Sequence, residues 1–409
     1  MKRTGKTAEI LLPRPAKLAL PAVFLTVSVG VNSAFQLASA SEIWSPFLLL
    51  DVGVHPKVGY FYLLAVIGIW LGTGLSIVFS RRTLKTQITT VIISVRRLRQ
   101  VTRILFLILL LMFIVTQIEL GSANLLNLWR GQVSALDVEN ALKLSSFGIH
   151  GLGLLVAYAF LLCWHVNRLA AVQSSLAAAG IVLASLYFLS NGKAQGMVYV
   201  AAAYLFQRTA QRGIYWRIIL ATAVIAILFV ITRLARNQSN DVDLDVYGVL
   251  LLAVGFYFGS PVSNTSFIMT NGLEVNALSA FFANFIPQKI VSTVEFFDLL
   301  PDPTSPVGLA GSALLLGGLA PAFVYFVCTG YLAQHVYQRS SATLASCLFM
   351  PFLFVACTFA MMYNHFMNLT FFWIPLCVAN VMSAHLIALR CNGIGNSIAV
   401  KASPSLRTK

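Results

Sequence analysis

Long apolar runs constrain the fold of this chain more than any other feature. Residues 104–118 read ILFLILLLMFIVTQI, and residues 58–79 contain no charged side chain. A helix needs about 20 apolar residues to cross a bilayer, and the second run reaches that length by itself. Hydrophobic residues make up 58% of the 409 positions and charged residues only 10%, a composition that excludes a soluble domain. The sequence therefore predicts a helical protein embedded in a membrane.

The hydropathy pattern predicts about ten crossings. The predicted spans are residues 18–40, 58–79, 104–120, 146–164, 170–190, 193–207, 218–233, 308–333, 343–362 and 369–389. Together they predict an all-α polytopic integral membrane protein that forms a single transmembrane domain over residues 1–409. One large loop, residues 234–307, lies within it.

The large loop contains two further apolar stretches, residues 246–270 and 277–297. If both cross the membrane, the protein has about twelve spans, and its termini stay on the same side. Otherwise the stretches form re-entrant or interfacial helices that cover a cavity. A cytoplasmic loop near residue 272 would carry no positive charge, so the second arrangement is favoured.

Basic residues predict the orientation, because short cytoplasmic loops are enriched in Lys and Arg. They gather in four segments that ten crossings place on one side: the N-terminal tail, residues 80–103, residues 208–217 and the C-terminal tail. Apart from Glu9, the acids fall in or beside the opposite loops. These acids are Glu42, Asp51, Glu119, Asp137, Glu139, Asp241, Asp243, Asp245, Glu274, Glu295, Asp298 and Asp302. Both termini are thus predicted to be cytoplasmic, and the net charge of +15 indicates anionic lipid as a partner, not nucleic acid.

Two arginines at the head of the large loop are the main candidates for substrate binding. Arg233 and Arg236 are one helical turn apart and share a helix face, and arginine binds phosphate oxygens in a bidentate manner. Alternatively, they extend towards lipid headgroups or pair with the acids of DVDLD at 241–245. Arginine on the outer side runs against the usual charge bias, which favours the functional interpretation.

Two turns supply further candidates. Lys193 lies in SNGKAQG, where glycines permit a sharp bend with exposed N–H groups that can hold an anion. His365 and Asn364 lie in MMYNHFMN, the predicted outward turn between the last two spans, where a histidine at the membrane surface can transfer a proton. The alternatives are an ordinary hairpin turn and a helix cap. The Asp241 and Asp243 carboxylates could hold a metal, but acidic loops are usually solvated, so no metal site is predicted.

Four segments resemble the oligosaccharide repeat-unit polymerases, the Wzy-type O-antigen polymerases of Gram-negative inner membranes. They are SNGKAQG at 190–196, TRLARN at 232–237, VYGVLLLAVGFYFGSPVSN at 246–264 and YNHFMN at 363–368. The predicted spans and the dominant late outer loop are similar too. The last segment also resembles the His-Asn turn of O-antigen ligases, although here Asn364 precedes His365.

The resemblance implies an enzyme that joins repeat units carried on undecaprenyl diphosphate, at the periplasmic face of the bacterial inner membrane. The lipid diphosphate already activates the sugar, in agreement with the absence of nucleotide-binding motifs, so no cofactor or metal is expected. A chain-length regulator and a flippase of the same pathway would be its partners.

The resemblance also implies roles for the candidate residues. Arg233 and Arg236 would bind the diphosphate, with Lys193 and Arg130 as secondary contacts. His365 or an acid such as Asp241 or Asp243 would take the acceptor proton. Tyr247, Tyr257 and Asn364 would contact sugar or lipid.

Two other functions compete with polymerisation. An O-antigen ligase uses the same donor and transfers the glycan to lipid A–core. A flippase or transporter usually has repeated halves and ionisable residues in mid-helix, whereas this chain has no repeat and keeps its charges near helix ends.

Overall fold

The computed structural model describes residues 7–12, 20–39, 55–80, 90–129, 133, 138, 141, 147–172, 174–190, 259–271, 308–361 and 363–388. Helices dominate this part of the chain. The longer ones are α1 (Leu20–Ser39), α2 (Val58–Ser80), α3 (Val95–Leu120), α6 (Phe147–Leu169), α7 (Ser175–Ser190), α11 (Ser260–Asn271), α15 (Leu319–Arg339), α16 (Leu344–Thr358) and α17 (Ile374–Leu386). The shorter ones are η1 (Gly121–Ala123), α4 (Leu125–Trp129), α14 (Gly308–Leu314), η3 (His365–Met367) and the π-helical turn η4 (Leu369–Trp373).

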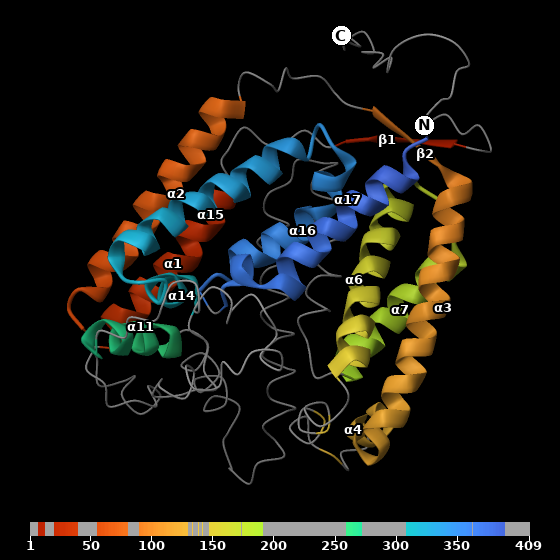
Figure 1. Ribbon diagram of the computed structural model, residues 1–409, viewed down its shortest axis with the longest axis horizontal. Coiled ribbons are helices and arrows are strands. Elements are labelled where there is room, and N and C mark those ends of the chain that lie inside the picture. Colours follow the sequence, from red (N-terminus) through yellow and green to blue (C-terminus); the bar gives the residue numbers. More distant parts are fainter. Residues whose placement is uncertain are drawn as a thin grey trace.

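The described helices pack as two groups with a pair of helices between them (Figure 1). Helices α1, α2 and α15 form one group, with α11 and α14 at their lower end. Helices α3, α6 and α7 form the other. Between the groups, α16 contacts α1, and α17 contacts α6. The central pair therefore links the two sides of the bundle.

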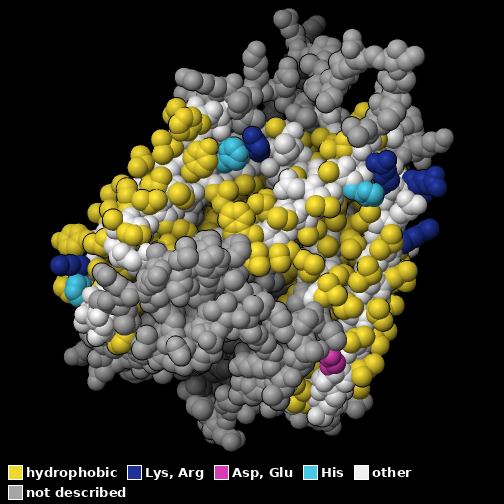
Figure 2. Space-filling model, in the orientation of Figure 1, with side chains coloured by type: hydrophobic (Ala, Val, Ile, Leu, Met, Phe, Trp, Pro, Cys, Tyr) yellow, Lys and Arg dark blue, Asp and Glu magenta, His cyan; other side chains and the backbone are white. Residues whose placement is uncertain are grey.

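The helices confirm a membrane protein. Among the described residues, four are long and apolar enough to cross a bilayer: Val58–Ser80, Val95–Ala123, Leu152–Leu169 and Leu319–Arg339. Shorter apolar helices cover Leu20–Ser33, Ser175–Ser190, Leu344–Thr358 and Phe371–Leu386. Large apolar side chains are exposed along α2 and α3, and apolar side chains cover the flanks in Figure 2, as a lipid environment requires. The predicted spans 193–207 and 218–233 lie outside the described residues.

Helices α2 and α15 run in parallel and touch through their backbones. A Cβ atom at Gly72 would meet the Val327 carbonyl oxygen, and one at Gly330 would meet that of Ile69. Thr73 Oγ1 also donates a hydrogen bond to the Gly330 carbonyl over 3.4 Å. Small residues allow membrane helices to approach closely, where dispersion and hydrogen bonds replace the hydrophobic effect. These glycines therefore fix the α2–α15 seam.

One predicted span is interrupted. Residues 308–333 were predicted as a single helix, but α14 ends at Leu314 and α15 begins at Leu319. Gly317 and Gly318 between them have φ angles of 113° and 94°, a region that only glycine adopts readily. The turn separates the short α14 from α15, which continues to Arg339.

A small antiparallel sheet departs from the all-α prediction. Strand β1 (Thr7–Leu11) pairs with β2 (Thr90–Ser94), which leads directly into α3. Ser94 caps that helix, since its Oγ accepts a hydrogen bond from the Arg97 amide at 3.3 Å. Consequently α3 begins nine residues before the predicted start at 104 and includes Arg96, Arg97, Arg99 and Arg103 of the basic loop.

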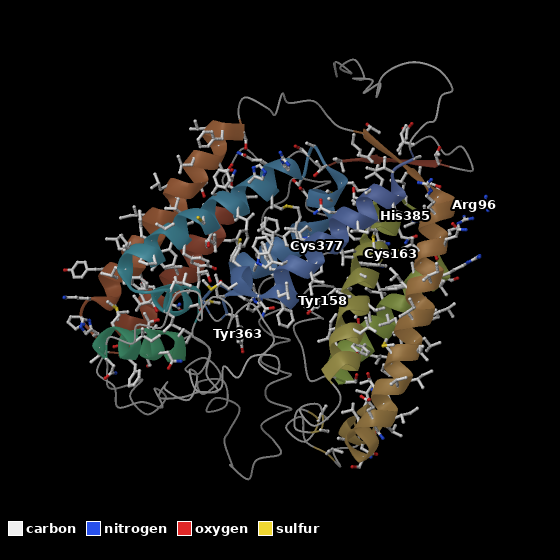
Figure 3. All side chains as sticks on the ribbon, viewed as in Figure 1. Arg96, Tyr158, Cys163, Tyr363, Cys377 and His385 are labelled. Carbon is white, nitrogen blue, oxygen red and sulfur yellow. The ribbon has the colours of Figure 1, made fainter. Side chains whose placement is uncertain are left out.

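The end of α17 joins this sheet. The Ala388 amide donates to the Ile92 carbonyl over 3.1 Å, and Ile387 forms a bridge with Ile93. Arg97 Nη1 donates to the His385 carbonyl over 3.1 Å. The N-terminal segment, the basic loop and the end of α17 therefore meet at one end of the bundle, which we call the basic end. Figure 3 shows Arg96 and His385 there, and Tyr363 towards the opposite side.

Helix α11 is the described part of the large loop. It has 12 residues and contacts α1, α2 and α14. In Figure 1 it runs across the lower end of α1 and α2 rather than along them. The rest of the two predicted apolar stretches, residues 246–258 and 272–297, lies outside the described residues.

Candidate functional site

Two of the predicted site residues, Asn364 and His365, can be placed. The others lie outside the described residues: Arg130, Lys193, Arg233, Arg236, Asp241, Asp243, Tyr247 and Tyr257. The site is therefore built from the turn that follows α16, at the end of the bundle opposite the basic end.

Hydrogen bonds fix the shape of this turn. The chain leaves α16 after Thr358, and His365–Met367 form the short helix η3. Asn368 then starts η4, because its Oδ1 accepts a hydrogen bond from the Phe371 amide at 3.0 Å. Trp373 Nε1 donates back to the Phe366 carbonyl over 2.8 Å. The turn therefore holds His365 on a defined backbone.

His365 is buried, contrary to the expectation that it lies at the membrane surface. Its side chain is 2% exposed, and its ring packs edge-on against Phe371 with centroids 6.0 Å apart. The Tyr363 ring lies on another side, 6.1 Å away. Removal from water disfavours the imidazolium form, so burial lowers the pKa of His365 below its ordinary value. The imidazole is thus neutral at neutral pH and able to accept a proton.

Asn364 connects the turn to α15. The Tyr325 hydroxyl donates to Asn364 Oδ1 over 2.7 Å, and Thr329 lies one turn further along α15 as a second neighbour of that hydroxyl. Asn364 Nδ2 is buried and has no hydrogen-bond partner among the described residues. Tyr363 next to it is 41% exposed. Asn364 is therefore a partly buried residue that links the turn to α15.

Helix α1 holds the start of the same turn. The Met361 amide donates to Ser28 Oγ over 2.7 Å, and that hydroxyl donates to the Thr358 carbonyl over 3.1 Å. One turn later, Asn32 Nδ2 donates to the Met361 carbonyl over 3.3 Å. Asn32 is 1% exposed, and its Oδ1 has no partner among the described residues.

Helix α11 adds a row of small polar side chains. Residues 263–266 read SNTS and are at most 2% exposed. Thr265 Oγ1 donates to the Pro261 carbonyl over 2.6 Å and lies beside the Tyr62 hydroxyl, while Ser266 Oγ accepts from the His55 amide at 2.6 Å. Four consecutive buried polar residues at the end of a membrane bundle are costly, which makes a functional role the default interpretation.

Gly308 brings α11 and the turn after α16 together. A Cβ atom at this position would meet the Met361 carbonyl oxygen and lie 3.4 Å from Pro261 Cβ. The neighbouring Leu309 amide donates to the Ala360 carbonyl over 2.7 Å. The start of α11 and the Met361 carbonyl that Asn32 binds thus both lie against Gly308.

We call this arrangement the polar cluster: Asn32, Tyr62, Ser263, Asn264, Thr265, Ser266, Tyr325, Asn364 and His365. Its members bear no charge at neutral pH, and no group of three or more metal-ligating side chains occurs in the part of the chain that the structure describes. The cluster can hydrogen-bond uncharged hydroxyls and accept one proton. The sequence analysis missed Asn32, Tyr325 and the α11 row; an asparagine inside an apolar helix and SNTS inside an apolar run were the available signals.

Comparisons of the chain with protein-family models, with curated proteins and with solved structures find no match.

Proposed function

We propose that the protein is a polymerase that joins oligosaccharide repeat units carried on undecaprenyl diphosphate, acting at the periplasmic face of the bacterial inner membrane. The polar cluster is the observation that supports this most. A set of buried, uncharged hydrogen-bonding groups beside a neutral histidine suits a reaction between sugars. In the proposed orientation, the basic end and both termini are cytoplasmic.

The reaction needs one nucleophile and one leaving group. A hydroxyl of the incoming repeat unit attacks the anomeric carbon of the growing glycan, and the bond from that carbon to the diphosphate oxygen breaks. Undecaprenyl diphosphate leaves with the bonding electron pair. The hydroxyl proton passes to neutral His365, or to Asp241 or Asp243 in the large loop.

The leaving diphosphate gains negative charge in the transition state. Arg233 and Arg236 would stabilise that charge, with Lys193 and Arg130 as further contacts, and Tyr247 and Tyr257 would contact sugar or lipid. Fixed arginines provide the positive charge that a divalent cation would otherwise supply, so the proposed transferase is independent of metal. A flippase would deliver the lipid-linked units, and a chain-length regulator would act on the product.

A deletion strain tests the proposal. Lipopolysaccharide from this strain should carry a single repeat unit on lipid A–core instead of a ladder, and the intact gene should restore the ladder. Complete absence of glycan from lipid A–core, with polymer retained on the lipid carrier, would indicate a ligase instead. The YNHFMN turn is the feature that favours that alternative. Retention of lipid-linked units on the cytoplasmic side would indicate a flippase.

A further inference from the structure

Two asparagines of the polar cluster each have one buried amide atom without a partner among the described residues. These atoms are Asn32 Oδ1 and Asn364 Nδ2. The orientation of the Asn32 amide follows from its other contact, because the Met361 carbonyl can only accept a hydrogen bond and so must face Nδ2. Buried polar groups without partners cost free energy, and so are rare unless water or a ligand satisfies them.

Asn364 lies in the turn after α16, and Asn32 of α1 contacts the start of that turn. Asn32 is bonded to Met361, and Asn364 follows that residue by three positions. Tyr325 holds the Oδ1 side of Asn364, and its Nδ2 stays available. His365, the proposed base, comes next in the chain. The turn that Asn32 contacts therefore carries both Asn364 and His365.

The chemistry of the two atoms selects a class of ligand. One is an acceptor and the other a donor, and neither carries charge. A hydroxyl group both donates and accepts, so the hydroxyls of one sugar can satisfy both atoms. A phosphate would have no donor hydrogen for Asn32, and a cation would meet the N–H group of Asn364. The 41% exposed ring of Tyr363 lies beside Asn364 and offers an apolar face to a sugar ring.

We propose that Asn32 and Asn364 bind hydroxyls of a sugar in the acceptor repeat unit and so place its nucleophilic hydroxyl beside His365. This assignment rests on the proposed polymerase function. It makes Asn32 and Asn364 binding residues for the acceptor glycan, separate from the arginines that would bind the diphosphate.

Binding to lipids with and without the glycan tests the proposal. The full-length protein is purified in nanodiscs. Two probes are used: lipid-linked single repeat units isolated from the deletion strain, and bare undecaprenyl diphosphate. Asn32→Leu and Asn364→Leu should each weaken binding of the repeat-unit lipid about tenfold, the effect of one lost buried hydrogen bond. Binding of the bare lipid should be unchanged.

Two matched controls separate recognition from damage to the turn. Ser28→Ala removes the bonds from α1 to Met361 and Thr358 but leaves Asn32 in place. Trp373→Phe removes the bond within the turn to the Phe366 carbonyl but leaves Asn364 and its partner Tyr325 in place. Both variants should bind the repeat-unit lipid like the wild type. If Asn32→Leu does not accumulate, Asn364→Leu with its Trp373→Phe control carries the same expectation.

The outcomes distinguish this proposal from the polymerase function. If the asparagine variants bind the repeat-unit lipid as the wild type does, or if the controls lose binding equally, the amides hold water or only support the turn, and the proposal is wrong. The polymerase function still stands in that case if the intact gene restores a ladder in cells. If the intact gene restores no ladder, the polymerase function is wrong, and the assignment of Asn32 and Asn364 to the acceptor glycan is wrong with it.

Discussion

The two ends of the helical bundle are held together by different chemistry. At the basic end, backbone pairs with backbone, in β1–β2 and between Ala388 and Ile92, and Arg97 binds the carbonyl of His385. At the polar cluster, buried neutral side chains make most of the connections. Buried side-chain atoms without partners among the described residues occur towards both ends, for example Asn167 Oδ1 and Gln334 Oε1 towards the basic end and Asn32 Oδ1 at the polar cluster.

From this difference we propose the polar cluster, and not the basic end, as the binding end. Charge at the basic end lies on exposed arginines of α3, where water and lipid headgroups can solvate it. In the polar cluster, Asn32 and Asn364 have buried amide atoms without partners among the described residues at the turn that carries His365, and we propose that a ligand restores these bonds. Four variants test this comparison.

Arg236→Ala should have the largest effect, because it removes positive charge proposed to lie at the reacting end. Loss of a bidentate contact that strengthens in the transition state should slow polymerisation about 10²–10³-fold. The lipopolysaccharide gel should then show mostly single repeats while the protein accumulates normally. Arg236→Lys should recover part of the rate, since an ammonium group retains the charge but cannot form the bidentate contact of a guanidinium group.

Arg212→Ala is the control on the side that is predicted to be cytoplasmic, and it should leave the ladder intact. A full-length ladder in both Arg233→Ala and Arg236→Ala would mean that these arginines contact only lipid headgroups. The site would then be sought at Lys193 and His365.

Gly72→Ala tests the close backbone contact between α2 and α15, two helices that run between the two ends. Its added methyl group would meet the Val327 carbonyl oxygen, so α2 and α15 must move apart. Such overpacking typically costs about 1–3 kcal/mol. Thermal unfolding of the detergent-solubilised protein should show a lower midpoint. Gly74→Ala lies on the same helix with nothing within 4 Å of the added carbon, and should be neutral or slightly stabilising. Equal destabilisation by the two would contradict the backbone contact.

His365 should make stability depend on pH at the polar cluster. Burial lowers its pKa in the folded state, so below the ordinary value of about 6.5 the unfolded chain binds more protons than the folded one. The free energy of unfolding is therefore undiminished above that pH. It declines as the pH falls below it, by at most about 1.4 kcal/mol per pH unit for one group. Unfolding midpoints at pH 7.5 and 5.5 should differ less in His365→Gln than in the wild type.

His385 serves as the matched histidine, since it is exposed at the basic end. His385→Gln should retain the pH dependence of the wild type. If His365→Gln retains it as well, His365 is not buried in the folded protein.

Arg97→Ala should have the smallest effect of the four. It removes hydrogen bonds from a charged donor to the His385 and Ile387 carbonyls, but at an exposed position, so we expect a loss of about 1 kcal/mol. Arg99→Ala, two residues further along α3, is the control and should leave the unfolding midpoint unchanged. An equal shift in both would assign the effect to the loss of positive charge alone.

Local sequence predicted the helices well where hydropathy alone decides them. The span predicted as 58–79 is α2, Val58–Ser80. The predicted start of α3 was wrong. Ser94 caps the helix, and the apolar stems of its arginines can lie along apolar surface, so the helix extends beyond its apolar part. The strands were missed because β1 pairs with a segment about eighty residues away, and no local pattern specifies such a partner.

The candidate site was predicted only as a turn. MMYNHFMN marked His365 and Asn364, but the burial of His365 depends on contacts with aromatic rings, which composition does not reveal. The partner atoms come from distant helices: Asn32 is 329 residues from Met361, and Tyr325 is 39 residues from Asn364. Sequence alone could not bring these groups together.

Cysteine labelling tests most directly whether the polar cluster and the basic end face opposite sides of the membrane. Single cysteines at Tyr363 and Arg99, both exposed, are introduced after the native cysteines are replaced, and intact spheroplasts are treated with a membrane-impermeant maleimide. The account predicts that Tyr363→Cys is labelled and that Arg99→Cys is labelled only after the membrane is opened. Labelling of Arg99→Cys but not Tyr363→Cys in intact spheroplasts would place the polar cluster in the cytoplasm and contradict the proposed function.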